Sequence, residues 1–156
     1  MTERLKERLN QLKFISSMFN MAMVEFNNVM GPETIQTIFR LIGERQGEVV
    51  EQRWREGDGI TNWTPELLAK KISTDLIDVA VGEGSSDITV NGNEMKVVIK
   101  DCPFKQAGIK IGDKFYCTYT EGLIDTISKK ALGNTEFKSL KLRSVDNCDC
   151  EFTIKT

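Results

Sequence analysis

The hydrophobic pattern of this chain changes from a helical period to strict alternation near residue 86, and this change limits the folds that it can adopt. Beyond it, apolar side chains occupy every second position on both sides of Asn91-Gly92, namely Ile88, Val90, Met95, Val97 and Ile99. Alternation places such residues on one face of a strand. Asn-Gly readily takes the positive φ values of a tight turn. The pattern therefore predicts a β-hairpin.

Three helices are predicted upstream of this hairpin. The first has apolar residues at a 4,3,4,3 spacing with one polar interruption, at Leu5, Leu9, Leu12, Ser16, Phe19, Met23, Phe26 and Met30. Pro32, directly after Gly31, begins the second helix. The third begins at the cap Thr64-Pro65-Glu66 and ends at Gly82; its apolar positions are Leu68, Ile72, Leu76 and Val79. The glycine-rich segment 54–63, WREGDGITNW, is predicted to be a loop.

Two glycines lie four residues apart inside the second helix, Gly43 and Gly47 in the phrase LIGERQGEVV. Glycine costs a helix about 1 kcal/mol relative to alanine, so an interior pair needs a reason. We expect the backbone of another element to approach the helix closely at these positions.

A fourth helix is predicted from about Lys114 to Leu132, closed by Gly133-Asn134, and two last strands are predicted near 136–145 and 150–156. Helices segregated from a small antiparallel sheet make an α+β fold. We expect one domain over residues 1–156, with a long N-terminal helix over 1–30 and an α+β body over 31–156 that binds the ligand. The apolar surface of the first helix exceeds one stripe, so the helix from Thr2 to Met30 is predicted to take part in a homodimer contact.

Composition excludes several classes of function. Lys plus Arg number 21 and Asp plus Glu 23, and the basic residues are scattered, so nucleic acid is not expected as a partner. The longest uncharged apolar stretch, residues 14–24, is far shorter than the roughly 20 residues that span a bilayer. We expect a cytoplasmic protein with reduced thiols. Histidine is absent, which excludes histidine-dependent triads, Cys-His pairs and HExxH zinc peptidases.

All four cysteines lie in the C-terminal half, at Cys102, Cys117, Cys148 and Cys150. Alternation from Phe152 and Ile154 puts Cys150, and by extension Cys148, on the inward face of the last strand. Two interpretations stay open. Buried cysteines serve as small hydrophobic residues, whereas clustered thiolates hold zinc or an iron–sulfur cluster. The spacing lacks the two Cys-x2-Cys pairs of a typical zinc site.

Four phrases, IGERQGE, CPF, FYCTYTEGLIDTISKKALG and DCEFTI, resemble the 4-vinyl reductase domain family of archaeal hydrocarbon-binding proteins and phenol sensors. The chain also looks like the transport protein particle components that share that fold. The resemblance implies a dimeric α+β domain that holds a small apolar molecule, in several members with zinc beside the pocket. It matches Cys102, Cys117 and Cys150 to family cysteines. The phrase SLKLRS departs from the pattern, which leaves Cys148, Asp146 or water as the fourth ligand.

The leading hypothesis is a noncatalytic module that binds a small hydrophobic ligand, with zinc organising the C-terminal hairpin. Phe104, Phe115 and Tyr119 flank the thiols and are candidates to line the pocket; the alternative for each is ordinary core packing. A second hypothesis is a redox or reductase-associated component with an iron–sulfur cluster, although no phosphate-binding loop or dinucleotide fingerprint is present. A third is a structural adaptor like the transport particle components.

Overall fold

The computed structural model describes residues 2–101, 104, 115–141 and 149–156. It forms two compact units, Met1–Ile35 and Gln36–Thr156. The first unit contains α1 (Glu3–Met30) and the start of α2 (Pro32–Gly57). Gly31 takes a φ of +80° between the two helices, and Pro32 begins α2 as predicted. None of the helices in these residue ranges has the length and apolar character needed to cross a membrane.

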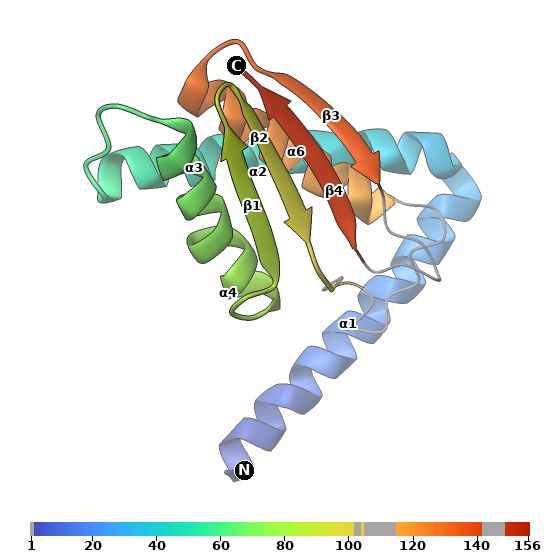
Figure 1. The fold of residues 1–156 in the computed structure, drawn as a ribbon. Coiled ribbons are helices and arrows are strands. Elements are labelled where there is room, and N and C mark those ends of the chain that lie inside the picture. The colour runs from blue at the N-terminus through green and yellow to red at the C-terminus, as the bar shows by residue number, and fades with distance from the viewer. Residues whose placement is uncertain (1, 102–103, 105–114, 142–148) are drawn as a thin grey trace. The chain divides into compact units, whose positions relative to one another are not determined.

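The second unit is an α+β body, which confirms the predicted fold class. After α2 its elements are α3 (Pro65–Lys71), η1 (Ile72–Ile77), α4 (Asp78–Val81), β1 (Ser86–Asn91), β2 (Glu94–Ile99), α6 (Phe115–Leu132), β3 (Glu136–Lys141) and β4 (Cys150–Lys155). The four strands form one antiparallel sheet in the order β1-β2-β4-β3. The helices α3, α4 and α6 lie on one side of this sheet (Figure 1).

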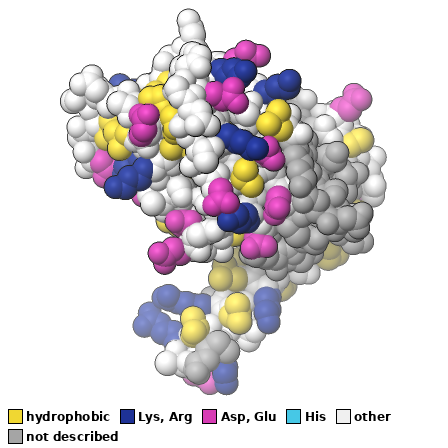
Figure 2. All heavy atoms as spheres, in the orientation of Figure 1, with side chains coloured by type: hydrophobic (Ala, Val, Ile, Leu, Met, Phe, Trp, Pro, Cys, Tyr) yellow, Lys and Arg dark blue, Asp and Glu magenta, His cyan; other side chains and the backbone are white. Residues whose placement is uncertain are grey.

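The two faces of the sheet differ in polarity. The inner face packs on the helices, and its core includes Leu68, Ile72, Met95, Val97, Ile124, Ile127, Phe152 and Ile154. The outer face carries ion pairs, with Lys96 Nζ 2.5 Å from Glu151 Oε1 and Lys155 Nζ 3.2 Å from Glu94 Oε2. Figure 2 shows acidic and basic side chains interspersed on the outer face. Exposed ion pairs contribute little to stability, so burial of the inner face holds the sheet in place.

The hairpin forms as predicted, but its turn lies one residue later than expected. Asn91 pairs with Glu94, so Gly92 and Asn93 are the two turn residues. Gly92 has a φ of +61°. A type II′ turn needs a positive φ at its first central position and favours glycine there. The preference of glycine for that position therefore decides the register.

The predicted loop over residues 54–63 is wrong in its first part, because α2 continues to Gly57. Trp54 is buried in the core, and Glu51 accepts a hydrogen bond from the Trp63 indole at 2.9 Å. Arg55 Nη2 lies 2.5 Å from the same carboxylate. These contacts stabilise the last turn of α2.

The predicted burial of Val79 is also wrong, since its side chain is 80% exposed. Between α3 and α4 the chain forms a π-helical turn, η1, and Ile77 is buried in place of Val79. A π turn holds one more residue than an α turn and so shifts the buried face along the sequence. The five-residue step from Ile72 to Ile77 is the sequence signal of this turn.

The close backbone approach predicted at Gly43 and Gly47 is confirmed. A Cβ atom on Gly43 would lie 2.2 Å from the Tyr119 carbonyl oxygen of α6, and one on Gly47 would lie 2.8 Å from the Leu123 oxygen. Gly122 approaches from the α6 side, where a Cβ would lie 2.4 Å from the Arg40 oxygen. The backbones of α2 and α6 therefore touch where these glycines meet.

An ion pair fixes the same helix pair beside this contact. Arg40 Nη2 donates to Asp125 Oδ2 at 2.9 Å, and Lys129 Nζ lies 2.9 Å from the same oxygen. The Asp125 side chain is only 6% exposed, so loss of Arg40 would leave a buried charge with less compensation.

We expect Gly43→Ala to lower the free energy of unfolding by about 1–3 kcal/mol, because the added methyl group cannot fit between two backbones. Gly57→Ala, in the same helix, is the matched control, since a Cβ on Gly57 would have no neighbouring atom within 4 Å. That change should be neutral or stabilise the protein by up to about 1 kcal/mol. Urea unfolding of both variants measures the difference, and equal effects would refute the close contact.

Candidate functional site

An apolar cavity lies inside the second unit between helices η1, α4 and α6 and strand β2. Its volume is about 150 Å³. The residues that line it are Leu76, Ile77, Ala80, Val81, Ile99, Phe104, Tyr119, Thr120, Leu123 and Ile124. Ile77, Ile99 and Ile124 are buried, whereas Ala80 is exposed. The cavity thus reaches from the core to the surface at α4.

The glycine contact and the π turn position two walls of this cavity. Gly43 touches the backbone of Tyr119 and Leu123, so the α2–α6 contact sets the position of the α6 wall. On the opposite wall, η1 turns Ile77 inward. Both walls therefore depend on local backbone features and not only on side-chain volume.

The described lining carries no charged side chain. Its hydroxyl groups belong to Tyr119 and Thr120, and Thr120 Oγ1 donates to the Tyr116 carbonyl at 3.3 Å. A cavity of about 150 Å³ lined by Leu, Ile and Phe in another protein stays dry and binds benzene or xenon. Pockets for drug-sized ligands are larger, about 300–1,000 Å³. This cavity therefore suits one aromatic ring or a short alkyl segment.

Aromatic rings pack beside the cavity, and one of them, Phe104, also lines it. Phe104 stacks on Tyr116 with ring centroids 4.6 Å apart, and Phe39 meets Tyr116 edge-on at 5.2 Å. Such pairs stabilise beyond their buried area. The cluster links α2 and α6 to Phe104, which follows the first hairpin in the sequence.

Two of the three residues proposed from sequence to bind a ligand, Phe104 and Tyr119, line the cavity. The side chain of Phe115 lies outside what the structure describes. The aliphatic wall, formed by Leu76, Ile77, Ala80 and Val81, was not predicted from the sequence. The five-residue step from Ile72 to Ile77 in the third predicted helix is the sequence feature that indicates this wall.

The cysteines proposed as metal ligands divide into two groups. Cys117 and Cys150 are each 1% exposed, and neither is in a disulfide. Cys150 pairs with Ile99, a residue of the cavity wall, and Cys117 lies one helical turn before Thr120. Cys102 and Cys148, like Asp146, lie outside the described residues. Among described residues no group of three or more His, Cys, Asp or Glu is arranged to hold a metal ion. The zinc site stays a prediction.

Burial raises the pKa of both tyrosine hydroxyls near this site, those of Tyr116 and Tyr119. Removing water disfavours the charged phenolate and leaves the neutral phenol less affected. Both groups are therefore neutral over the physiological range.

Comparison with known proteins supports the fold. No family model matches the chain, and no curated protein matches it. The structure is similar to the crystal structure of trafficking protein particle complex subunit 3 from Naegleria fowleri, covalently bound to palmitic acid. The TM-score is 0.51 at 14% sequence identity, over 92% of this chain and 95% of that chain.

The chain has the fold of a transport protein particle component. At 14% identity the likeness concerns the fold alone. It confirms the predicted likeness in fold to these components, whereas the resemblance to the 4-vinyl reductase domain family receives no support.

Tyr119 lines the cavity and Tyr116 stacks on Phe104, which also lines it, and the chain has no other tyrosine. We expect native protein to ionise both above the ordinary value of about 10, and unfolded protein to ionise them near it. Stability that depends on the neutral phenols is complete below pH of about 10 and is lost as pH rises through the native pKa. Ultraviolet titration with and without urea measures this. Coincident titrations would contradict it, and Tyr119→Phe isolates Tyr116.

Proposed function

We propose that this chain is a noncatalytic binding module that holds a small apolar molecule in the cavity between η1, α4, α6 and β2. The observation that carries the proposal is that the described lining is uncharged and offers a ligand mainly dispersion contacts. The similar fold of a protein bound to palmitic acid also supports it.

The cavity volume limits the ligand. At about 150 Å³ it reaches half of the lower bound for drug-sized ligands, about 300 Å³. A single aromatic ring or the end of an alkyl chain fits this space. We therefore infer a ligand of hydrocarbon character that enters past Ala80, an exposed residue of the lining.

We further propose that the cysteines bind zinc and so organise the C-terminal hairpin. Cys117 and Cys150 are buried thiols on two elements next to the cavity, which suits a thiolate donor set. Cys102 and either Cys148, Asp146 or water would complete the four ligands. The redox alternative, an iron–sulfur cluster, uses the same thiols, and protein purified without oxygen distinguishes them because a cluster is brown.

We also propose a cytoplasmic homodimer in which α1 contributes to the contact. Large apolar side chains of α1 are exposed in more than one stripe, with Phe14 at 73%, Met21 at 69% and Val29 at 82%. Burial of such a surface favours association. A monomer in sedimentation at micromolar concentration would exclude this dimer. A structural adaptor without ligand remains the alternative if no apolar probe binds.

A cavity-filling variant tests the ligand proposal. Benzene should raise the melting temperature of the native protein, because a ligand that binds only the folded state stabilises it, by about 2.7 kcal/mol at a hundredfold excess over Kd. Because Ala80 is part of the lining, we expect the ring of Ala80→Phe to occupy the cavity and abolish this rise. Val79→Phe is the matched control, since Val79 is 80% exposed and lies one residue away. A rise that survives Ala80→Phe, or no rise in native protein, would contradict the proposal.

The zinc proposal has a separate test. Native protein should contain about one zinc ion per chain, and a chelator should lower its melting temperature, since a structural metal stabilises the fold. Cys150→Ser should abolish both the metal content and the effect of the chelator. If the chelator leaves native protein unchanged, the cysteines serve as small core residues.

A further inference from the structure

The strand β1 forms one edge of the sheet, so one row of its backbone groups faces away from β2. The Lys100 N–H donates to the Ser85 carbonyl at 2.8 Å, so Ser85 directs its oxygen towards β2. In an antiparallel ladder these directions alternate along the strand. The N–H and C=O groups of Ser86, Ile88 and Val90 therefore point away from β2.

These edge groups have no hydrogen-bond partner within the part of the chain that the structure describes. The opposite edge is different, because β3 has a register shift between Ser139 and Lys141 and carries the exposed Lys138. Bulges and lysines are features by which proteins prevent a further strand from pairing with an edge. The register of β1 is unbroken, and its sequence SDITVN contains neither lysine nor proline. Of these two strands, only β3 thus has a bulge and a lysine.

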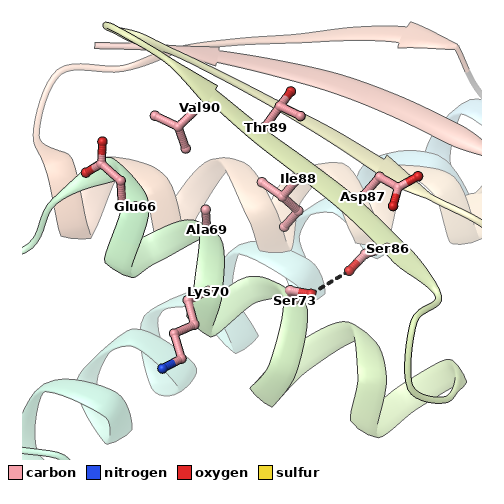
Figure 3. A pocket seen from close by; sticks show the side chains of 9 residues that line it. All are labelled: Glu66, Ala69, Lys70, Ser73, Ser86, Asp87, Ile88, Thr89 and Val90. Atoms are coloured by element: carbon pink, nitrogen blue, oxygen red, sulfur yellow. Dashed lines mark hydrogen bonds between the residues drawn. The ribbon is translucent and has the colours of Figure 1, made fainter.

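A groove of about 690 Å³ runs along the β1 edge. Its second wall comes from α3 and η1, through Glu66, Ala69, Lys70 and Ser73. Figure 3 shows Ile88 and Val90 directed towards Ala69, and Asp87 and Thr89 directed to the other face. Ser73 and Ser86 are joined through their hydroxyls at 2.7 Å. The groove thus has an apolar floor beside a row of backbone donors and acceptors.

We propose that this edge binds an extended segment of a partner protein, which adds to the sheet as a further strand next to β1. A peptide backbone repeats its donor and acceptor every two residues, roughly 6.6 Å, and so matches the spacing of the edge groups. Side chains directly opposite in such a pair share a face. The segment therefore needs apolar residues at the alternate positions opposite Ser86, Ile88 and Val90.

Charge at the groove adds a second requirement. Glu66 and Lys70 are exposed on the α3 wall, and neither has an ion pair with any described residue. A segment whose ends are polar, or carry charges opposite to those of Glu66 and Lys70, is therefore favoured over a segment that is apolar throughout.

Amide hydrogen exchange measured by NMR tests this proposal on the whole protein. In the free protein, the amides of Ser86, Ile88 and Val90 should exchange rapidly, and those of Asp87 and Thr89 slowly. The probe is a synthetic peptide with the β2 sequence EMKVVI, which already complements β1. Its addition should slow exchange at Ser86, Ile88 and Val90 in proportion to the fraction bound.

Two N-methylated forms of the peptide provide the matched control. In the bound peptide, the residues whose side chains face the groove are also those whose N–H groups donate to β1. N-methylation of these residues, which are Met, the first Val of the VV pair and Ile, should therefore abolish binding. Methylation at Glu, Lys and the second Val should preserve it. Equal binding of both forms would overturn the proposal. So would slow exchange at Ser86, Ile88 and Val90 in the free protein, or no response to millimolar unmodified peptide.

Discussion

The backbone contact between α2 and α6 is the constraint on which the rest of the body depends. Three glycines make it possible, because a Cβ on Gly43, Gly47 or Gly122 would lie within 3 Å of backbone atoms of the other helix. The α6 helix thereby reaches the sheet at a fixed depth, with Leu123, Ile124 and Ile127 in the core. Because Tyr119 and Leu123 lie at the contact and also line the cavity, the packing of two helices determines the size of the proposed binding site.

Sequence predicted those features whose cause is local. The glycine pair indicated a close backbone approach, alternation indicated the hairpin, and Pro32 marked the start of α2. The π turn was not predicted, because the third helix was given a period of 3.6 residues throughout. The five-residue step between the buried residues Ile72 and Ile77 departs from that period. The turn at Gly92 moved by one residue because glycine favours the first position of a type II′ turn.

The cavity itself could not be predicted from sequence in the same way. Its lining comes from α4, α6, β2 and Phe104, which are far apart along the chain, and a cavity is the space that tertiary packing leaves unfilled. Phe104 and Tyr119 were selected because they lie near cysteines, whereas the aliphatic wall follows from the π turn.

The apolar cavity and the open β1 edge also differ in chemistry. The cavity offers dispersion contacts and the edge offers hydrogen bonds, so they suit different ligands.

The space between Ile77, Ile99 and Leu123 is where we propose that an apolar guest binds. Crystals pressurised with xenon test it most directly, because xenon enters dry apolar cavities of about this size and scatters X-rays strongly. We predict a xenon site bounded by these three side chains, with little displacement of the surrounding helices. Ordered water at that position, or side chains that fill it and exclude xenon, would contradict the account.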